Sequence, residues 1–128
     1  MTTAPANTLE EVQPGIWLLR FASKDTMTGA ACEPLVPALA KACQSGPIML
    51  LAVIPKDVTL VPPSLAPFWL DAMLRKGVKV RAIGVSSTSR AVRVAVNAFQ
   101  AAMKLSRVEI GAAIFPTEAE LVAWARKH

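Results

Sequence analysis

A chain of 128 residues, of which 53% are hydrophobic and 18% charged, is long enough for one domain with a single core and too apolar to stay disordered. Its best candidate for a membrane span, 48–54, falls far short of the roughly 20 apolar residues that a transmembrane helix needs. The formal charge of +5 is scattered along the chain. We therefore expect a soluble protein that does not bind nucleic acid.

The N-terminal residues, the two cysteines and the single histidine indicate the location of the protein and which sites it can form. Residues 1–7 lack the basic leader and apolar stretch of a secretory signal, so we interpret them as the flexible N-terminus of a cytoplasmic protein, followed by a single domain at 8–128. Cys32 and Cys43 are expected about 16 Å apart in one helix, which excludes a mutual disulfide and favours buried thiols. The single histidine, His128, is the last residue, and no cluster of Cys, His, Asp or Glu has the spacing of a metal site, so we predict no metal. We also predict no cofactor.

The first elements in chain order are a hairpin and a helix. Extended segments at 8–12 and 16–22 flank a Pro-Gly turn, which is typical of hairpin strands. Apolar residues at helical spacing predict a first helix over 28–43. Its start is open, because Pro34 or Pro37 inside a helix would remove a hydrogen bond and the helix would then begin at one of them.

The middle of the chain predicts the centre of a sheet. The apolar run 48–54 between two prolines indicates a strand that is covered on both faces. After a loop at 56–63, a helix is predicted over 64–76, where a glycine ends it. The segment 78–85 alternates apolar and basic residues before it becomes fully apolar, as in a strand whose start approaches a sheet edge.

The last third continues the alternation of helices and strands. Hydroxyl residues at 86–89 precede an amphipathic helix over 90–105, a strand is predicted at 108–115, and Thr117 with Glu120 forms the capping-box pattern of a final helix. Alternating strands and helices imply parallel crossover connections. We therefore predict an α/β fold, with a mixed, mostly parallel sheet opened by an N-terminal hairpin and about four helices.

Two passages carry the strand-to-helix pattern most clearly. Residues 80–99 read VRAIGVSSTSRAVRVAVNAF, and residues 114–124 read IFPTEAELVAW. Together they resemble the STAS-like family, which includes the sporulation anti-anti-sigma factors and SEC14-like single-domain proteins. The resemblance covers nearly the whole chain and implies a STAS-like sheet and a regulatory protein that binds a partner protein. Such motifs are structural and support the fold more than the function.

The phosphorylatable members of that family carry a switch serine at the start of the helix after the central strand. The matching segment here, 61–65, reads VPPSL, so the resemblance brings Ser64 near the switch serine, without the family's aspartate and glycine. A phosphate there would be stabilised by the free N–H groups and the dipole of the helix N-terminus. The alternative is that Ser64 is a simple N-cap.

The helix at 64–76 is the preferred interaction face. Phe68 and Trp69 are neighbours, which point about 100° apart on a helix, so one of them is expected to be exposed at a partner surface. The predicted partner-binding residues are Ser64, Phe68, Trp69 and Arg75. The sequence does not identify the partner protein, and a homodimer stays open.

The hydroxyl loop before the helix at 90–105 is a second candidate site. Parallel sheets commonly bind anions or small ligands where a strand ends and a helix begins. The residues at that position are Ser86, Ser87, Thr88, Ser89 and Arg90. A capping loop would explain the same hydroxyl groups without a ligand. This site, or an apolar pocket under the helices, would make the protein a small-molecule or lipid-binding module.

The residues available for catalysis are few. Asp25 and Asp57 lie in predicted loops, where aspartates commonly cap turns instead of serving as an acid and base pair. We therefore expect a non-enzymatic regulatory protein-protein interaction domain that resembles anti-sigma factor antagonists, with a small-molecule or lipid-binding module as the alternative. An open apolar cavity would favour the alternative, whereas a filled core with an exposed Phe68 or Trp69 would favour the interaction domain.

Overall fold

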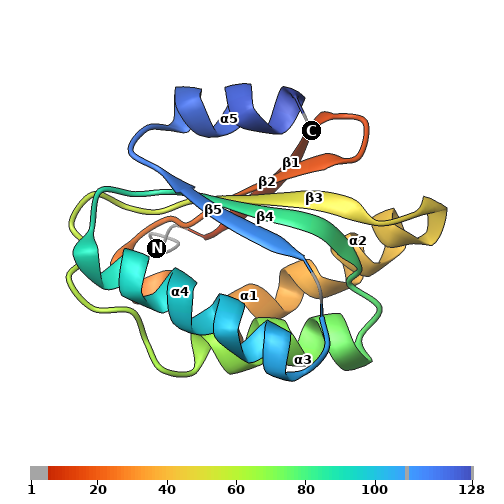
Figure 1. Cartoon of the computed structure of the whole chain (residues 1–128), viewed down its shortest axis with the longest axis horizontal. Helices are drawn as coiled ribbons and strands as arrows, with labels where there is room; N and C mark the ends of the chain where they lie inside the picture. Colours follow the sequence, from red (N-terminus) through yellow and green to blue (C-terminus); the bar gives the residue numbers. More distant parts are fainter. Residues whose placement is uncertain (1–5, 109, 128) are drawn as a thin grey trace, which may run out of the picture.

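A five-stranded sheet forms the centre of the computed structural model, which describes residues 6–108 and 110–127 (Figure 1). The strands lie side by side in chain order: β1 (Thr8–Gln13), β2 (Ile16–Arg20), β3 (Ile48–Val53), β4 (Val80–Ser86) and β5 (Gly111–Phe115). β1 and β2 are antiparallel, and every other pair of neighbours is parallel. The predicted mixed, mostly parallel sheet opened by a hairpin is confirmed.

Helices cover both faces of the sheet. One face carries α1 (Gly29–Cys32), α2 (Val36–Ala42), α3 (Leu65–Arg75) and α4 (Arg90–Leu105), and the other carries α5 (Glu118–Arg126). Short 3-10 turns occur at η1 (Lys24–Thr26), η2 (Glu33–Leu35) and η3 (Cys43–Ser45). None of the helices in the described part of the chain has the length and apolar character needed to cross a membrane.

The predicted helix over 28–43 is broken into segments by its prolines. Pro34 lies in the first turn of η2, and Pro37 lies in the first turn of α2. Proline is tolerated there because the first N–H groups of a helix have no partner within the helix. The prolines therefore divide the helix and do not delay its start. Cys32 and Cys43 consequently fall in different segments, and both are free, buried thiols as predicted.

The last strand begins later than the sequence pattern indicates. The prediction started it at residue 108, but β5 begins at Gly111. The Val108 N–H still donates to the Met103 carbonyl oxygen at 2.8 Å, which keeps this segment tied to the end of α4. Arg107 makes the turn with a φ of 61°, in the left-handed region. Val108, which the apolar pattern assigned to the strand, is thus hydrogen-bonded to the end of α4 instead.

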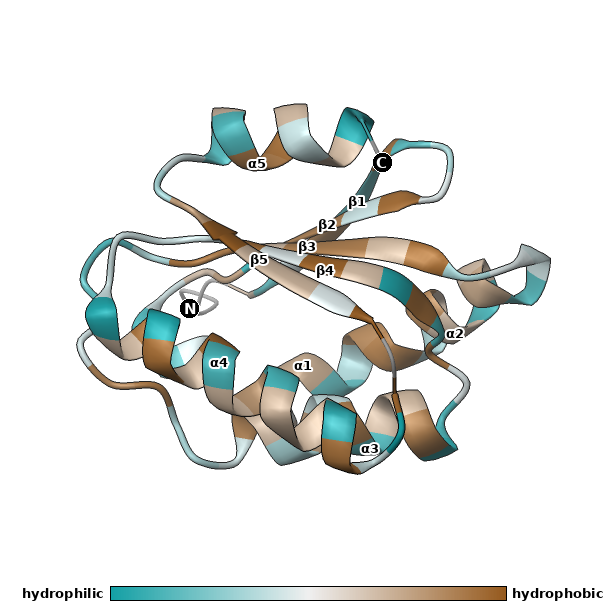
Figure 2. Ribbon diagram, in the orientation of Figure 1, coloured by the Kyte–Doolittle hydropathy of each residue, from teal (hydrophilic) through white to brown (hydrophobic). Residues whose placement is uncertain are grey.

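The sheet separates two hydrophobic clusters. Alternate side chains of a strand point to opposite faces. Leu19 and Leu50 belong to the larger cluster, under α1 to α4, whereas Leu18 and Leu51 belong to the smaller one, under α5. Figure 2 shows hydrophobic residues along the central strands. The apolar run at 48–54 is therefore a central strand covered on both faces, as predicted.

The segment before β1 is attached to the domain at Asn7. Its side-chain nitrogen donates to the Thr26 carbonyl at 2.9 Å, and its side-chain oxygen accepts the Ala22 N–H at 3.0 Å. The flexible N-terminus over 1–7 stays a prediction, and these two hydrogen bonds tie its last residue, Asn7, to the segment after β2. Residues 1–5 lie outside the described residues, as does His128.

Candidate functional site: an apolar cavity under α3 and α4

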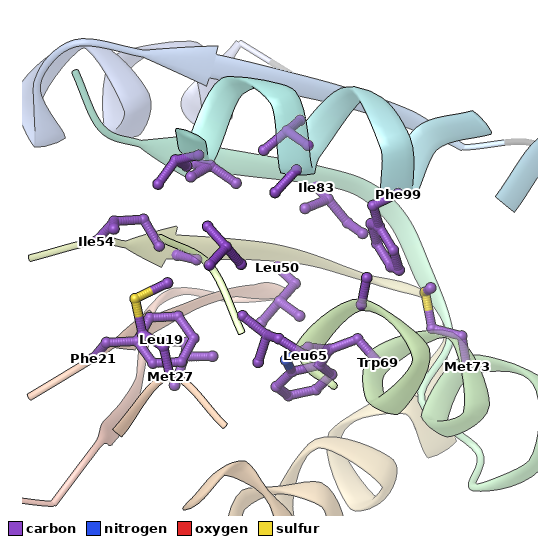
Figure 3. A pocket seen from close by; sticks show the side chains of 17 residues that line it. Leu19, Phe21, Met27, Leu50, Ile54, Leu65, Trp69, Met73, Ile83 and Phe99 are labelled. Carbon is purple, nitrogen blue, oxygen red and sulfur yellow. The ribbon is translucent and has the colours of Figure 1, made fainter. Parts of the chain in front are cut away.

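A cavity of about 120 Å³ lies between the sheet and helices α3 and α4. In Figure 3, Leu65, Trp69 and Met73 surround it from α3, Phe99 from α4, and strand residues such as Leu50 from the sheet. All 17 residues that line it are hydrophobic. The cavity therefore favours uncharged groups and offers no partner for a charge or a hydrogen bond.

Small residues help to explain why this space is not filled. Ala66 of α3, Ala95 of α4 and Ala52 of β3 all line the cavity. A methyl side chain reaches less far into the gap between a helix and a sheet than the leucines and valines around it. The connection at 54–64, between β3 and α3, has no regular secondary structure and contributes Ile54 and Val61 to the wall. The space thus arises where two helices and an irregular connection meet the sheet.

The Trp69 ring contributes apolar surface to the cavity wall, and its indole N–H pairs with the thiol of Cys32. Burial raises the pKa of the Cys32 thiol to about 11, and a hydrogen bond with the Trp69 indole lowers it by a smaller amount. The indole N–H is the only hydrogen-bond donor of a tryptophan side chain, so this hydrogen bond leaves no unpaired polar group on Trp69. Trp69 is 9% exposed. It therefore belongs to the cavity wall and the core.

The two aromatic residues predicted at a partner surface both pack inward. Phe68 is half-buried and meets the Trp69 ring edge-on, with centroids 5.3 Å apart. Gly29 of α1 lies so close that a Cβ built on it would be 3.0 Å from the Phe68 ring. The expectation that Phe68 or Trp69 is exposed is therefore wrong, because α1 packs against the Phe68 ring and Trp69 is only 9% exposed.

The remaining residues of the predicted partner site are accessible. Ser64 is exposed at the N-cap position of α3, and its side chain makes no capping hydrogen bond. Ser64 is thus the N-cap residue, as the alternative interpretation had it, but its hydroxyl group does not cap the helix. The Arg75 side chain is 81% exposed, with its Nε 3.3 Å from Oδ1 of Asp71 one turn earlier. The structure thus separates Ser64 and Arg75 at the surface from Phe68 and Trp69 inside.

The hydroxyl loop at 86–90 contains capping interactions. Ser89 accepts the Val92 N–H at 3.4 Å, and the Ser87 hydroxyl accepts the Ser89 N–H at 3.0 Å. These are the interactions expected of a capping loop at the start of α4. None of the five residues lines the cavity, although Val85 and Val92 on either side do. The predicted ligand site and the cavity are therefore different places.

A pocket under the helices was among the predicted sites, but the amino-acid pattern does not identify the residues that line it. Leu65, Met73 and Val96 line the cavity and lie at the apolar positions of the helices predicted over 64–76 and 90–105, and the same spacing is typical of ordinary core residues. The feature of the sequence that could have indicated the cavity is a pair of small residues, Ala66 and Ala95, at helix positions that line it. In the described part of the chain, no group of three or more His, Cys, Asp or Glu residues could hold a metal ion.

The sheet order, the hairpin at one edge and the distribution of helices define a STAS-like α/β fold. A crystal structure of an uncharacterized protein from the DUF3478 family, with a SpoIIAA-like fold, from Shewanella loihica PV-4, is similar over 98% of each chain. The TM-score is 0.65 and the sequence identity is 15%. The resemblance to the STAS-like family is therefore confirmed at the level of the fold. No protein-family profile and no curated protein matches the chain.

Proposed function

We propose that this protein is a non-enzymatic binding module that accepts an uncharged apolar group in the cavity under α3 and α4. The observation that carries the proposal is a cavity of about 120 Å³ with an entirely hydrophobic lining. A cavity of about 150 Å³ lined by Leu, Ile and Phe stays dry and binds benzene in another protein. The ligand is therefore a small aromatic ring or the end of an acyl chain.

The energetic cost of the cavity supports a role for it. At about 24 cal/mol per Å³, an empty space of 120 Å³ corresponds to about 3 kcal/mol of stability. Domains are typically stable by only about 5–15 kcal/mol, so this is a substantial fraction. An apolar ligand would restore part of this lost stability, because each methylene group that it buries contributes about 0.8 kcal/mol. A ligand with a charged head would have to leave that head outside.

The test is thermal unfolding of the protein with benzene, with octanoate, and with glycerol as a polar control. A ligand at about 100 times its Kd stabilises the folded state by about 2.7 kcal/mol, so benzene or octanoate should raise the Tm by several degrees. A shift with benzene alone indicates a ligand of ring size, and a shift with octanoate indicates an acyl chain. Glycerol should give no shift.

Two leucine substitutions on α4 separate binding in the cavity from binding elsewhere. Ala95→Leu places a larger side chain in the cavity and should remove the ligand-induced shift, whereas Ala98→Leu, at an exposed position of the same helix, should keep it. Equal shifts in both variants, or no shift in the unmodified protein with either ligand, would show that the cavity is not a binding site.

A regulatory protein-protein interaction is the second candidate function. Ser64 favours it, because its hydroxyl group is exposed at the start of α3 and makes no capping bond. A phosphate on this group would disrupt no capping hydrogen bond and would gain stabilisation from the helix N-terminus. The test is mass spectrometry of the protein from its native cells, together with partner binding by Ser64→Ala. The switch is rejected if no phosphate is found and Ser64→Ala binds its partner unchanged.

A further inference from the structure

The two edges of the sheet differ in their protection against an added strand. β1 carries Glu10 and Glu11 and has a register shift between Glu11 and Gln13. Charges and bulges of this kind discourage edge-to-edge pairing. β5, at the opposite edge, reads GAAIF and has no charge, no proline and no register shift against β4. Its outer backbone groups are therefore suited to pairing with another strand.

A groove of about 500 Å³ borders the start of this unprotected edge. On one side, α4 contributes Asn97, Gln100 and Lys104. On the other side lie Arg107 and Ile110, from the segment that leads into β5. Asn97, Gln100, Lys104 and Arg107 are all exposed. The groove thus presents side-chain donors next to a free strand edge.

Among the described residues, the helix that forms the groove and the turn after it carry only positive charges. Between positions 90 and 108, the cationic residues are Arg90, Arg93, Lys104 and Arg107, and no Asp or Glu occurs. Glu109 follows, outside the described residues. Lys104 and Arg107 form no ion pair with any other described residue. Figure 2 shows hydrophilic residues repeated along α4. Negative charge from another molecule would be attracted to this groove.

We propose that the β5 edge and the adjacent groove dock an extended, acidic segment of a partner protein. The segment adds a strand to the sheet through backbone hydrogen bonds, and its carboxylates lie against Lys104 and Arg107. Backbone pairing supplies sequence-independent affinity, and the charges select the partner. The site is separate from the apolar cavity, so either can exist without the other.

Charge favours such a partner over a second copy of this chain. Antiparallel pairing of two β5 strands about a two-fold axis would place both α4 helices on the same face of the joined sheet. Each cationic helix would then face the other, and like charges at an interface oppose association. An acidic strand meets the same backbone edge with an attractive charge.

The test measures fluorescence anisotropy of a labelled peptide of about eight alternating Glu and Val residues, which is strand length. We expect the protein to bind it, with weaker binding at higher salt. A peptide of alternating Lys and Val should not bind. A Glu-Val peptide with N-methyl groups along one edge keeps the charge but loses the backbone donors, and should bind about tenfold more weakly or worse. Amide hydrogen exchange over 111–115 should slow in the complex.

A matched pair of variants tests the groove. Lys104→Glu with Arg107→Glu should weaken binding of the Glu-Val peptide about tenfold or more. Lys24→Glu with Lys41→Glu makes the same change in net charge at exposed positions before β3, and should have a much smaller effect. The proposal is overturned if the two double variants weaken binding equally, if about 1 mM protein does not bind the peptide, or if protection appears at β1. It is also overturned if sedimentation shows a dimer that competes with the peptide.

Discussion

Arg20, at the end of β2, and Glu118, at the start of α5, join two elements that are far apart in the sequence. Nη1 of Arg20 lies 2.5 Å from Oε1 of Glu118, and Nη2 lies 3.2 Å from Oε2. The hydrogen bond to Arg20 lowers the pKa of the Glu118 carboxyl group, and the same contact raises the pKa of Arg20. The side chains are 44% and 43% exposed, so solvent weakens the pair.

Glu118→Gln should therefore lower the free energy of unfolding modestly, by up to about 1 kcal/mol at neutral pH. A carboxyl group whose folded pKa is lowered stabilises the fold above its unfolded pKa of about 4.3, and that contribution is lost as the pH falls through the folded value. Urea unfolding at neutral and acidic pH measures the difference between the two proteins, which should shrink toward zero in acid. Glu120→Gln, in the same helix turn, is the control. A difference that stays constant with pH would contradict this account.

At the scale of elements, the fit of α5 against the sheet depends on a glycine in β4. A Cβ at Gly84 would come within 2.5 Å of the Leu121 side chain and 2.8 Å of the Trp124 ring. Thr117 is the N-cap of this helix, and its hydroxyl accepts the Glu120 N–H at 3.2 Å. The cap sets where α5 starts, and the glycine sets how closely the helix approaches the sheet.

Gly84→Ala should consequently displace α5 and lower the free energy of unfolding by about 1–3 kcal/mol, as is usual for overpacking in a core. Urea unfolding measures the effect. Gly111→Ala is the matched control, because a Cβ there would meet no atom within 4 Å. If the two substitutions have the same effect, the close approach of α5 is not what requires glycine at 84.

At the scale of the whole molecule, the large cluster under α1 to α4 is incompletely filled, whereas the small cluster under α5 is packed against Gly84. The sheet is shared, so the difference comes from what covers each face. One short helix can settle closely on a sheet. Several helices joined through irregular connections must also pack against one another, and the cavity lies where two of them meet the sheet.

Ala95→Leu should therefore be tolerated, and it should raise the free energy of unfolding by up to about 2 kcal/mol in the ligand-free protein, because it fills existing space. Equilibrium urea unfolding tests this, with Ala98→Leu as the exposed counterpart. Strong destabilisation by Ala95→Leu would mean that the space beside Ala95 cannot accept a larger side chain.

The order of strands and helices follows from the amino-acid sequence alone. Gly15 in the hairpin turn, the apolar run at 48–54 and the Thr117 cap act through neighbouring residues, so their effect can be interpreted from local patterns. How the elements fit together depends instead on tertiary contacts. The position of Phe68 under α1, the Arg20–Glu118 pair and the cavity beside Ala66 depend on contacts between residues distant in the chain, and apolar spacing marks a wall residue and a core residue alike.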